Sequence, residues 1–82
     1  MILSEKEDRF KFLTEYTSAK VVEMLMKVHG MSLQEALLTF HNSETFEKLC
    51  DIETGLYIES PMFVYSLYLD ERKYGTLHGM TE

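Results

Sequence analysis

Residues that interrupt helices are few and widely spaced in this chain. Its 82 residues include one proline and four glycines, and none of these lies between residues 5 and 29. Because glycine and proline disfavour a helix interior more than any other residues, this segment can form one long helix. The breakers that divide the remainder stand at Gly30, Gly55, Pro61 and Gly75. This spacing predicts an all-α fold.

Capping residues refine the expected helix boundaries. The pattern Ser-x-x-Glu, in which a hydroxyl and a carboxylate satisfy free backbone N–H groups at a helix start, occurs at Ser4 and again at Ser32. Ser43 can cap a short helix, and Ser60 followed by Pro61 is a favourable start for the last one. We therefore expect a small bundle of three main helices and one short helix, over residues 5–29, 32–41, 44–51 and 61–73.

The length of the chain allows one small domain. We expect residues 1–75 to form a single helical domain and residues 76–82 to be a flexible tail. The segment 51–59 has no helical period and is expected to connect the third and fourth helices. Within it, Leu56 and Ile58 are expected to pack against the bundle, because they are too apolar for a free loop.

The segment 62–69 also fits a second interpretation. It is rich in residues that favour strands, and Leu56-Tyr57-Ile58 could pair with it as a hairpin. Ser60-Pro61 is a poor hairpin turn, however, because two-residue turns favour glycine or asparagine with positive φ. We prefer the helix for this reason.

The longest predicted helix carries apolar residues on two opposite faces. At about 100° per residue, the expected core face holds Phe10, Leu13, Val21, Met24, Leu25 and Val28. The opposite face holds Phe12, Tyr16, Ala19, Val22 and Met26. Either a kink near Thr17-Ser18 brings both faces into one core, or the second face contacts another chain. We expect a homodimer whose interface includes Phe12, Tyr16, Ala19 and Met26, together with Tyr65 and Tyr68.

The charge of the chain is acidic and unevenly distributed. Residues 1–30 hold five acidic and five basic residues, so the net charge of −6 lies entirely in residues 31–82. An acidic surface repels nucleic acid and anionic membranes, so we expect neither as a partner. Glu44, Glu47 and Asp51 share one side of the short third helix. They are a candidate docking patch for a protein with a basic surface, or simply a solvated face.

Residues capable of chemistry are scarce. Cys50 and His41 are the only candidate nucleophile and base, and Cys50 lies near a helix C-terminus, where the helix dipole disfavours a thiolate. His29, His41, His78 and Cys50 match no paired spacing of metal ligands. We therefore expect no catalytic residues, no metal site and no cofactor.

The second and third predicted helices have the length of a helix-turn-helix. In that motif the second helix must offer Arg, Lys, Asn or Gln to the bases, whereas Glu44 and Glu47 lie here with Lys48 alone opposing them. These acidic residues disfavour DNA recognition, so a small transcriptional regulator is retained only as the alternative function. Phosphate-binding glycine loops and the GxSxG hydrolase motif are absent from the sequence.

Features that bear on cellular location are also few. A single cysteine cannot form an internal disulfide, and the N-terminus lacks an apolar run of signal-peptide length. No stretch approaches the ~20 apolar residues that span a bilayer. We expect a cytoplasmic protein.

The order of motifs adds a resemblance. A long amphipathic helix is followed by Gly30-Met31-Ser32-Leu33-Gln34-Glu35-Ala36, and later by Glu53-Thr54-Gly55-Leu56-Tyr57-Ile58-Glu59-Ser60-Pro61 before a Tyr-rich helix. Over residues 8–72 the chain resembles a group of short, uncharacterised bacterial helical proteins, some of which are encoded beside ADP-ribosyltransferase-like toxins. The resemblance implies an antitoxin-like or accessory role and carries no catalytic residues. We expect a non-enzymatic protein-interaction module.

Overall fold

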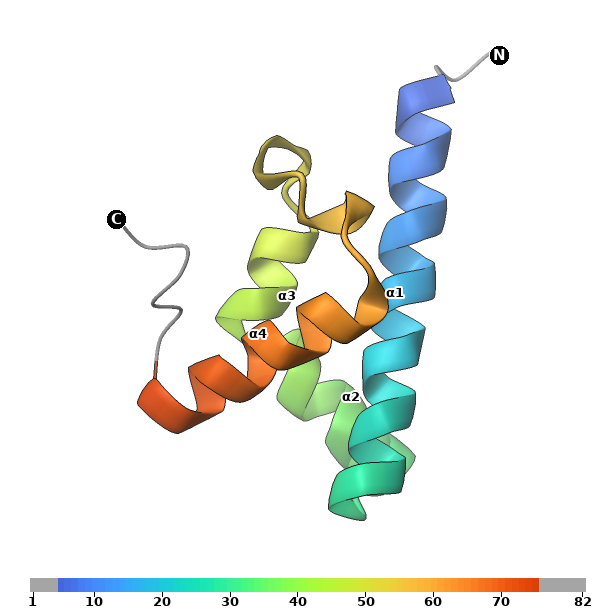
Figure 1. The fold of residues 1–82 in the computed structure, drawn as a ribbon. Coiled ribbons are helices and arrows are strands. Elements are labelled where there is room, and N and C mark those ends of the chain that lie inside the picture. Colours follow the sequence, from blue (N-terminus) through green and yellow to red (C-terminus); the bar gives the residue numbers. More distant parts are fainter. Residues whose placement is uncertain (1–4, 76–82) are drawn as a thin grey trace.

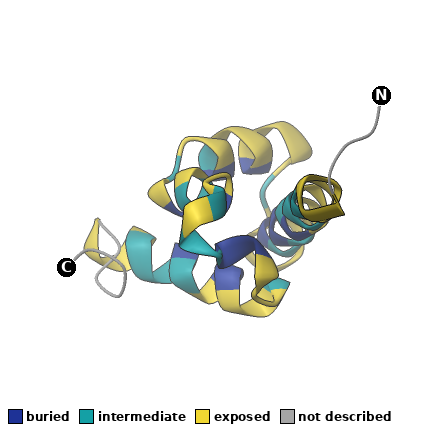
Figure 2. Cartoon of the chain, turned by 90° about the horizontal axis from the view of Figure 1, so that it is seen from above, coloured by how far each residue is buried: buried dark blue, intermediate teal, exposed yellow. Residues whose placement is uncertain are grey.

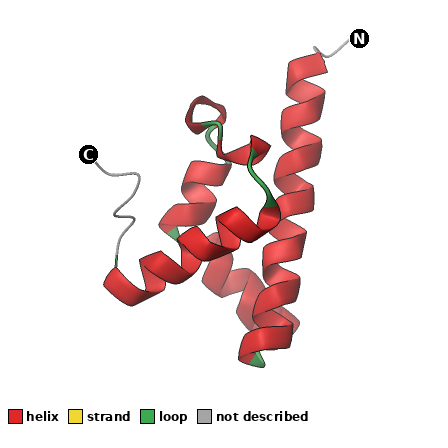
Figure 3. Ribbon diagram, in the orientation of Figure 1, coloured by secondary structure: helices red, strands yellow, loops and turns green. Residues whose placement is uncertain are grey.

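The fold consists of helices joined by short turns. The computed structural model describes residues 5–75, which form α1 (Glu5–His29), α2 (Leu33–His41), α3 (Glu44–Leu49) and α4 (Pro61–Tyr74). Two short 3₁₀ turns, Ile52–Thr54 and Leu56–Ile58, connect α3 to α4. Figure 1 shows α4 beginning beside the middle of α1 and running away from it in front of α2 and α3. The described residues contain no strand (Figure 3), so the predicted all-α fold is confirmed and the hairpin alternative is wrong.

The predicted caps account for most of the helix boundaries. The side chains of Ser32, Ser43 and Ser60 each accept a hydrogen bond from a backbone N–H three residues later, at 3.1 Å. Gly30 and Gly75 have φ of 69° and 80° and follow the ends of α1 and α4. These left-handed conformations favour glycine, because a Cβ would be crowded there. The predicted capping residue Ser4 and the predicted tail 76–82 lie outside the described residues.

The structure corrects one helix boundary and the expected structure of one segment. The third helix ends at Leu49 rather than Asp51, because the Asp51 side chain accepts a hydrogen bond from the Glu53 N–H and starts the first 3₁₀ turn. The segment 51–59 was predicted to lack helical structure. It is instead built from the two 3₁₀ turns, with Gly55 between them at φ 69°.

The core lies where the four helices converge, and Figure 2 shows buried residues along the inner sides of the helices. Phe40 of α2 is at its centre, with ring centroids 5.4 Å from Phe46 and 5.6 Å from Tyr68 in edge-to-face contacts. Such contacts stabilise by ~1 kcal/mol beyond area burial. The buried residues around this cluster include Val21, Leu25, Ala36, Leu49, Leu56 and Val64.

Helix α1 is continuous through Thr17 and Ser18, so the two apolar faces are not folded into one core by a break in the helix. Val22, assigned to the second face, is buried with 5% exposure, whereas Val28, assigned to the core face, is 67% exposed. Val28 lies in the last turn of α1, two residues before the chain turns at Gly30.

Two residues of the predicted dimer interface lie in the core instead. Tyr65 is 8% exposed and Tyr68 is 2% exposed. The Tyr65 hydroxyl lies 3.0 Å from His29 Nε2, which ties α4 to the end of α1. Helix α4 crosses the bundle, so Tyr65 contacts α1 and Tyr68 contacts α2 rather than solvent. The prediction that Tyr65 and Tyr68 contribute to a contact with another chain is therefore wrong.

Candidate functional site

An open groove of about 600 Å³ runs along one side of α1. We call it the α1–α2–α3 groove. Its first wall comes from α1 and consists of Thr14, Glu15, Ser18, Ala19, Val22, Glu23 and Met26. Its second wall comes from the helices that follow and consists of Leu33, Leu37, His41, Phe46 and Cys50.

Helical periodicity explains how these residues come to share one surface. On α1, lining residues recur every four positions, and on α2 the three lining residues are also four apart. Residues at i and i+4 lie on the same side of a helix. The chain reverses at Gly30, so Met26 and Leu33 lie at the end of the groove next to that turn. Thr14 and Glu15, with Phe46 and Cys50, lie at the opposite end.

The predicted second face of α1 borders this groove. Ala19 and Met26 line it, and Phe12 and Tyr16 lie on its outer edge at about 100° per residue. Phe12 is 65% exposed and Tyr16 is 47% exposed, and their rings stack with centroids 6.3 Å apart. Two neighbouring exposed aromatic rings enlarge the apolar surface that the groove offers.

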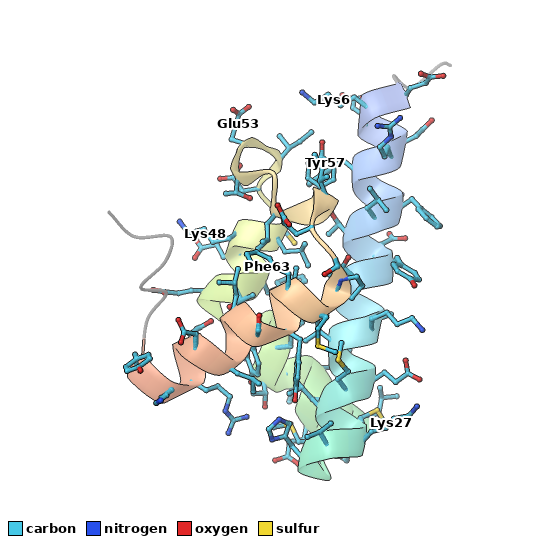
Figure 4. All side chains as sticks on the ribbon, viewed as in Figure 1. Lys6, Lys27, Lys48, Glu53, Tyr57 and Phe63 are labelled. Carbon is cyan, nitrogen blue, oxygen red and sulfur yellow. The ribbon has the colours of Figure 1, made fainter. Side chains whose placement is uncertain are left out.

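The charged residues of the α1 wall differ in their pairing. The Glu23 carboxylate lies 3.3 Å from Lys27 Nζ and 3.6 Å from Lys20 Nζ. The hydrogen bond from Lys27 and the charges of both lysines lower the pKa of Glu23. Lys27 marks the lower end of α1 in Figure 4 and points away from the other helices. Glu15 has no such ion pair among the described residues.

The residues of the predicted acidic docking patch, Glu44, Glu47 and Asp51, are all exposed. The backbone N–H of Glu44 donates to the Glu71 carboxylate, and the Asp51 side chain also caps the first 3₁₀ turn. Glu47 is exposed and follows the lining residue Phe46 in the chain. Thr45 and Leu49 are buried. Glu47 therefore lies on the solvent side of the groove.

Cys50 and His41 both line the groove, as the sequence allowed, but the structure shows no activated thiol. Burial raises the pKa of Cys50, which disfavours the thiolate. The His41 ring stacks on Phe46 with centroids 4.4 Å apart. The His41 ring therefore contacts Phe46, and among the described residues no hydrogen bond joins it to Cys50.

Other candidate chemistry is not assembled in the part of the chain that the structure describes. Within residues 5–75, no three His, Cys, Asp or Glu side chains are grouped so that they could hold a metal ion. His78 of the candidate metal set lies outside these residues. Among the described helices, none combines the length and the apolar character needed to cross a bilayer.

The helices compared with a helix-turn-helix are α2 and α3. Helix α3 has only six residues, and its exposed charged side chains are Glu44 and Glu47. Lys48 is half-buried and lies with Glu53 on the side of the chain away from α1 (Figure 4). The surface of α3 carries no basic face that could approach phosphates.

Sequence reasoning identified the α1 side of the groove but not its second wall. Leu33 and Leu37 are 55% and 36% exposed. Their spacing of four residues indicates that they share one side of α2. Only the position of α2 beside α1 shows that this side faces the same groove as Val22 and Met26. Comparisons with protein-family models, curated protein sequences and solved structures return no match.

Proposed function

We propose that this chain is a non-enzymatic protein-interaction module that binds its partner through the α1–α2–α3 groove and the adjoining rings of Phe12 and Tyr16. One observation supports this most strongly. The groove is lined mainly by apolar atoms, and the exposed rings of Phe12 and Tyr16 lie on the same helix, next to its α1 wall. Exposed apolar surfaces of this extent are typical of interaction sites.

The chemistry of the groove favours binding over catalysis. Apolar atoms form most of its surface even though Glu15, Glu23 and His41 line it, and burial raises the pKa of Cys50, the one candidate nucleophile. A catalytic thiol needs a lowered pKa or a neighbouring base. We place the module in the cytoplasm, and an antitoxin-like or accessory role, implied by the resemblance above, would use this same surface. A homodimer would use it too, through Phe12, Tyr16, Ala19 and Met26.

The test is site-specific photo-crosslinking in the cells that naturally produce the protein. A photoreactive phenylalanine analogue replaces Tyr16 beside the groove, and a matched variant carries it at Tyr74, which is exposed at the end of α4. We expect a discrete adduct with a protein from position 16 and not from position 74. Mass spectrometry then distinguishes a different protein from a second copy of the chain.

The same experiment can contradict the proposal. If position 16 gives no adduct, or if both positions give the same set of adducts, the groove is not a specific protein-binding surface. A gel-shift assay with duplex DNA at low salt tests the alternative of a transcriptional regulator. We expect no salt-sensitive DNA binding, because the acidic surface repels phosphates.

A further inference from the structure

The groove is long enough to hold a helix of a partner. From Thr14 to Met26 the α1 wall spans ~18 Å, at 1.5 Å per residue. This is the length of about three turns of a partner helix. Ser18 and Ala19 occupy the middle of the wall. Small side chains there allow a second helix backbone to approach α1 closely.

The two ends of the groove differ in polarity. At the end next to the turn at Gly30, the lining residues Val22, Met26, Leu33 and Leu37 are apolar. At the opposite end, Glu15 lines the groove and Glu47 flanks it, and neither has an ion pair among the described residues. Glu23 is balanced by its two lysine partners. Within residues 5–75, no lysine or arginine lines the groove.

The aromatic edge adds apolar surface beside the groove. Phe12 and Tyr16 precede Ala19 in the chain and therefore lie toward the acidic end of the groove. Lys20 Nζ lies 5.7 Å from the centroid of the Tyr16 ring, so this ring already holds a cation of the chain itself. The exposed Phe12 ring therefore adds apolar contact area, rather than a cation site, toward the acidic end.

A second copy of the chain is a poorer occupant. In an antiparallel symmetric pairing of two α1 helices about Ala19, Glu15 of one copy would face Glu23 of the other, because each lies four residues from Ala19. Each copy also brings a net charge of −6, all of it in residues 31–82, which contribute the second wall of the groove. Like charges placed across an interface disfavour association.

Building on the proposed function, we propose that the α1–α2–α3 groove binds an amphipathic helix of a partner protein. The apolar face of this helix lies along α1 between Ala19 and Leu37, and its basic end lies at Glu15 and Glu47. This is recognition of a helix in a groove, in which apolar side chains supply affinity and the charged end fixes the direction of the bound helix.

The experiment uses two fluorescent synthetic peptides of about 14 residues, or four helical turns. Both carry the same leucine face, and one end bears either lysines or glutamates. Anisotropy at low salt measures their binding to the full chain. We expect the lysine peptide to bind at least about tenfold more tightly, with the difference shrinking as salt is added.

Variants locate the binding. Ala19→Gln, a larger polar residue on an exposed position of α1, is expected to weaken the lysine peptide by about tenfold or more, whereas Ser66→Gln on the exposed side of α4 leaves it unchanged. Glu15→Gln is expected to reduce the preference for lysine, and Glu59→Gln, the same change in charge outside the groove, is not. The bound peptide is also expected to slow alkylation of Cys50, which lines the groove.

Four results would overturn the inference. They are equal binding of the two peptides, equal effects of Glu15→Gln and Glu59→Gln, undiminished alkylation of Cys50, and a dimer by light scattering that Ala19→Gln dissociates. A dimer that Ala19→Gln dissociates would mean that a second copy of the chain occupies the groove. If neither peptide binds while the photoreactive residue at position 16 still crosslinks to a partner protein, the proposed function is retained. The inference that the partner binds as a helix is then rejected.

Discussion

The carboxylate of Glu71 on α4 caps the start of α3 through Thr45. Glu71 Oε1 accepts hydrogen bonds from the Thr45 N–H at 3.0 Å and from the Thr45 hydroxyl at 2.8 Å, and Oε2 accepts one from the Glu44 N–H at 2.8 Å. A helix of six residues is marginal by itself. Its position in the bundle therefore depends on this contact between two helices, with Ser43 providing the local cap.

We expect Glu71→Gln to lower the free energy of unfolding by ~1–2 kcal/mol, because an amide replaces a charged acceptor of three hydrogen bonds. Urea denaturation followed by circular dichroism measures the change. Glu59→Gln is the matched control and should change stability by less than about 0.5 kcal/mol. If both variants lose the same amount, loss of charge rather than the cap explains the effect.

We expect a substitution at Thr14, on the wall of the groove, to stabilise the chain. Its hydroxyl oxygen is buried and makes no hydrogen bond. Because a buried polar group without a partner costs free energy, we expect Thr14→Val to raise the free energy of unfolding by ~1 kcal/mol. The same substitution at Thr45 should lower it, since that hydroxyl donates to Glu71. Thermal and urea denaturation of the two variants should differ in sign, and a loss of stability in Thr14→Val would contradict the prediction.

Leu56 and Ile58, in the segment between α3 and α4, differ in burial although the sequence predicted that both would be buried. Leu56 is 3% exposed, whereas Ile58 is 66% exposed, so the expectation that both pack on the bundle holds for Leu56 and is wrong for Ile58. The reason is the 3₁₀ geometry, which replaces the extended alternation assumed from the sequence. Tyr57 takes the second buried place and packs edge-on against Phe10 of α1, with centroids 4.9 Å apart (Figure 4).

We therefore expect Leu56→Ala to cost ~2–3 kcal/mol, the usual range for a buried leucine. Ile58→Ala should cost less than about 0.5 kcal/mol, as for other exposed positions. Denaturant midpoints of the two variants measure the difference. Equal losses would mean that Ile58 is buried in solution.

The start of α4 was predictable because its cap is local. Ser60 Oγ accepts a hydrogen bond from the Phe63 N–H at 3.1 Å, and Pro61 occupies the first helical turn, where its missing N–H removes no helical bond. We expect Ser60→Ala to lower the free energy of unfolding by ~1 kcal/mol and Pro61→Ala to have little effect. A reversed ranking in chemical denaturation would indicate that Pro61 limits a turn rather than beginning a helix.

The sequence predicts features that depend on neighbouring residues, but not those that depend on contacts between distant helices. Caps such as Ser32 and Ser60, and the glycines at positive φ, act within a few residues, and the helix boundaries follow from them. The bond between Glu71 and Thr45 joins residues 26 positions apart. It depends on how α4 crosses the bundle, as does the burial of Tyr65, whereas the second wall of the groove depends on how α2 and α3 lie beside α1. No local pattern specifies that crossing.

Cys50 provides the last prediction, because it distinguishes a binding surface from a catalytic one. Burial raises the pKa of its thiol, so less thiolate is present near neutral pH than in the unfolded chain. Since the thiolate is the reactive form, iodoacetamide should alkylate Cys50 more slowly in the folded chain than in urea, and the difference should narrow as the pH is raised. His41→Ala should leave the folded rate unchanged, because the His41 ring stacks on Phe46 rather than activating the thiol. A folded rate that exceeds the unfolded rate and falls in His41→Ala would instead indicate an activated thiol, and the groove would then have to be considered as an active site.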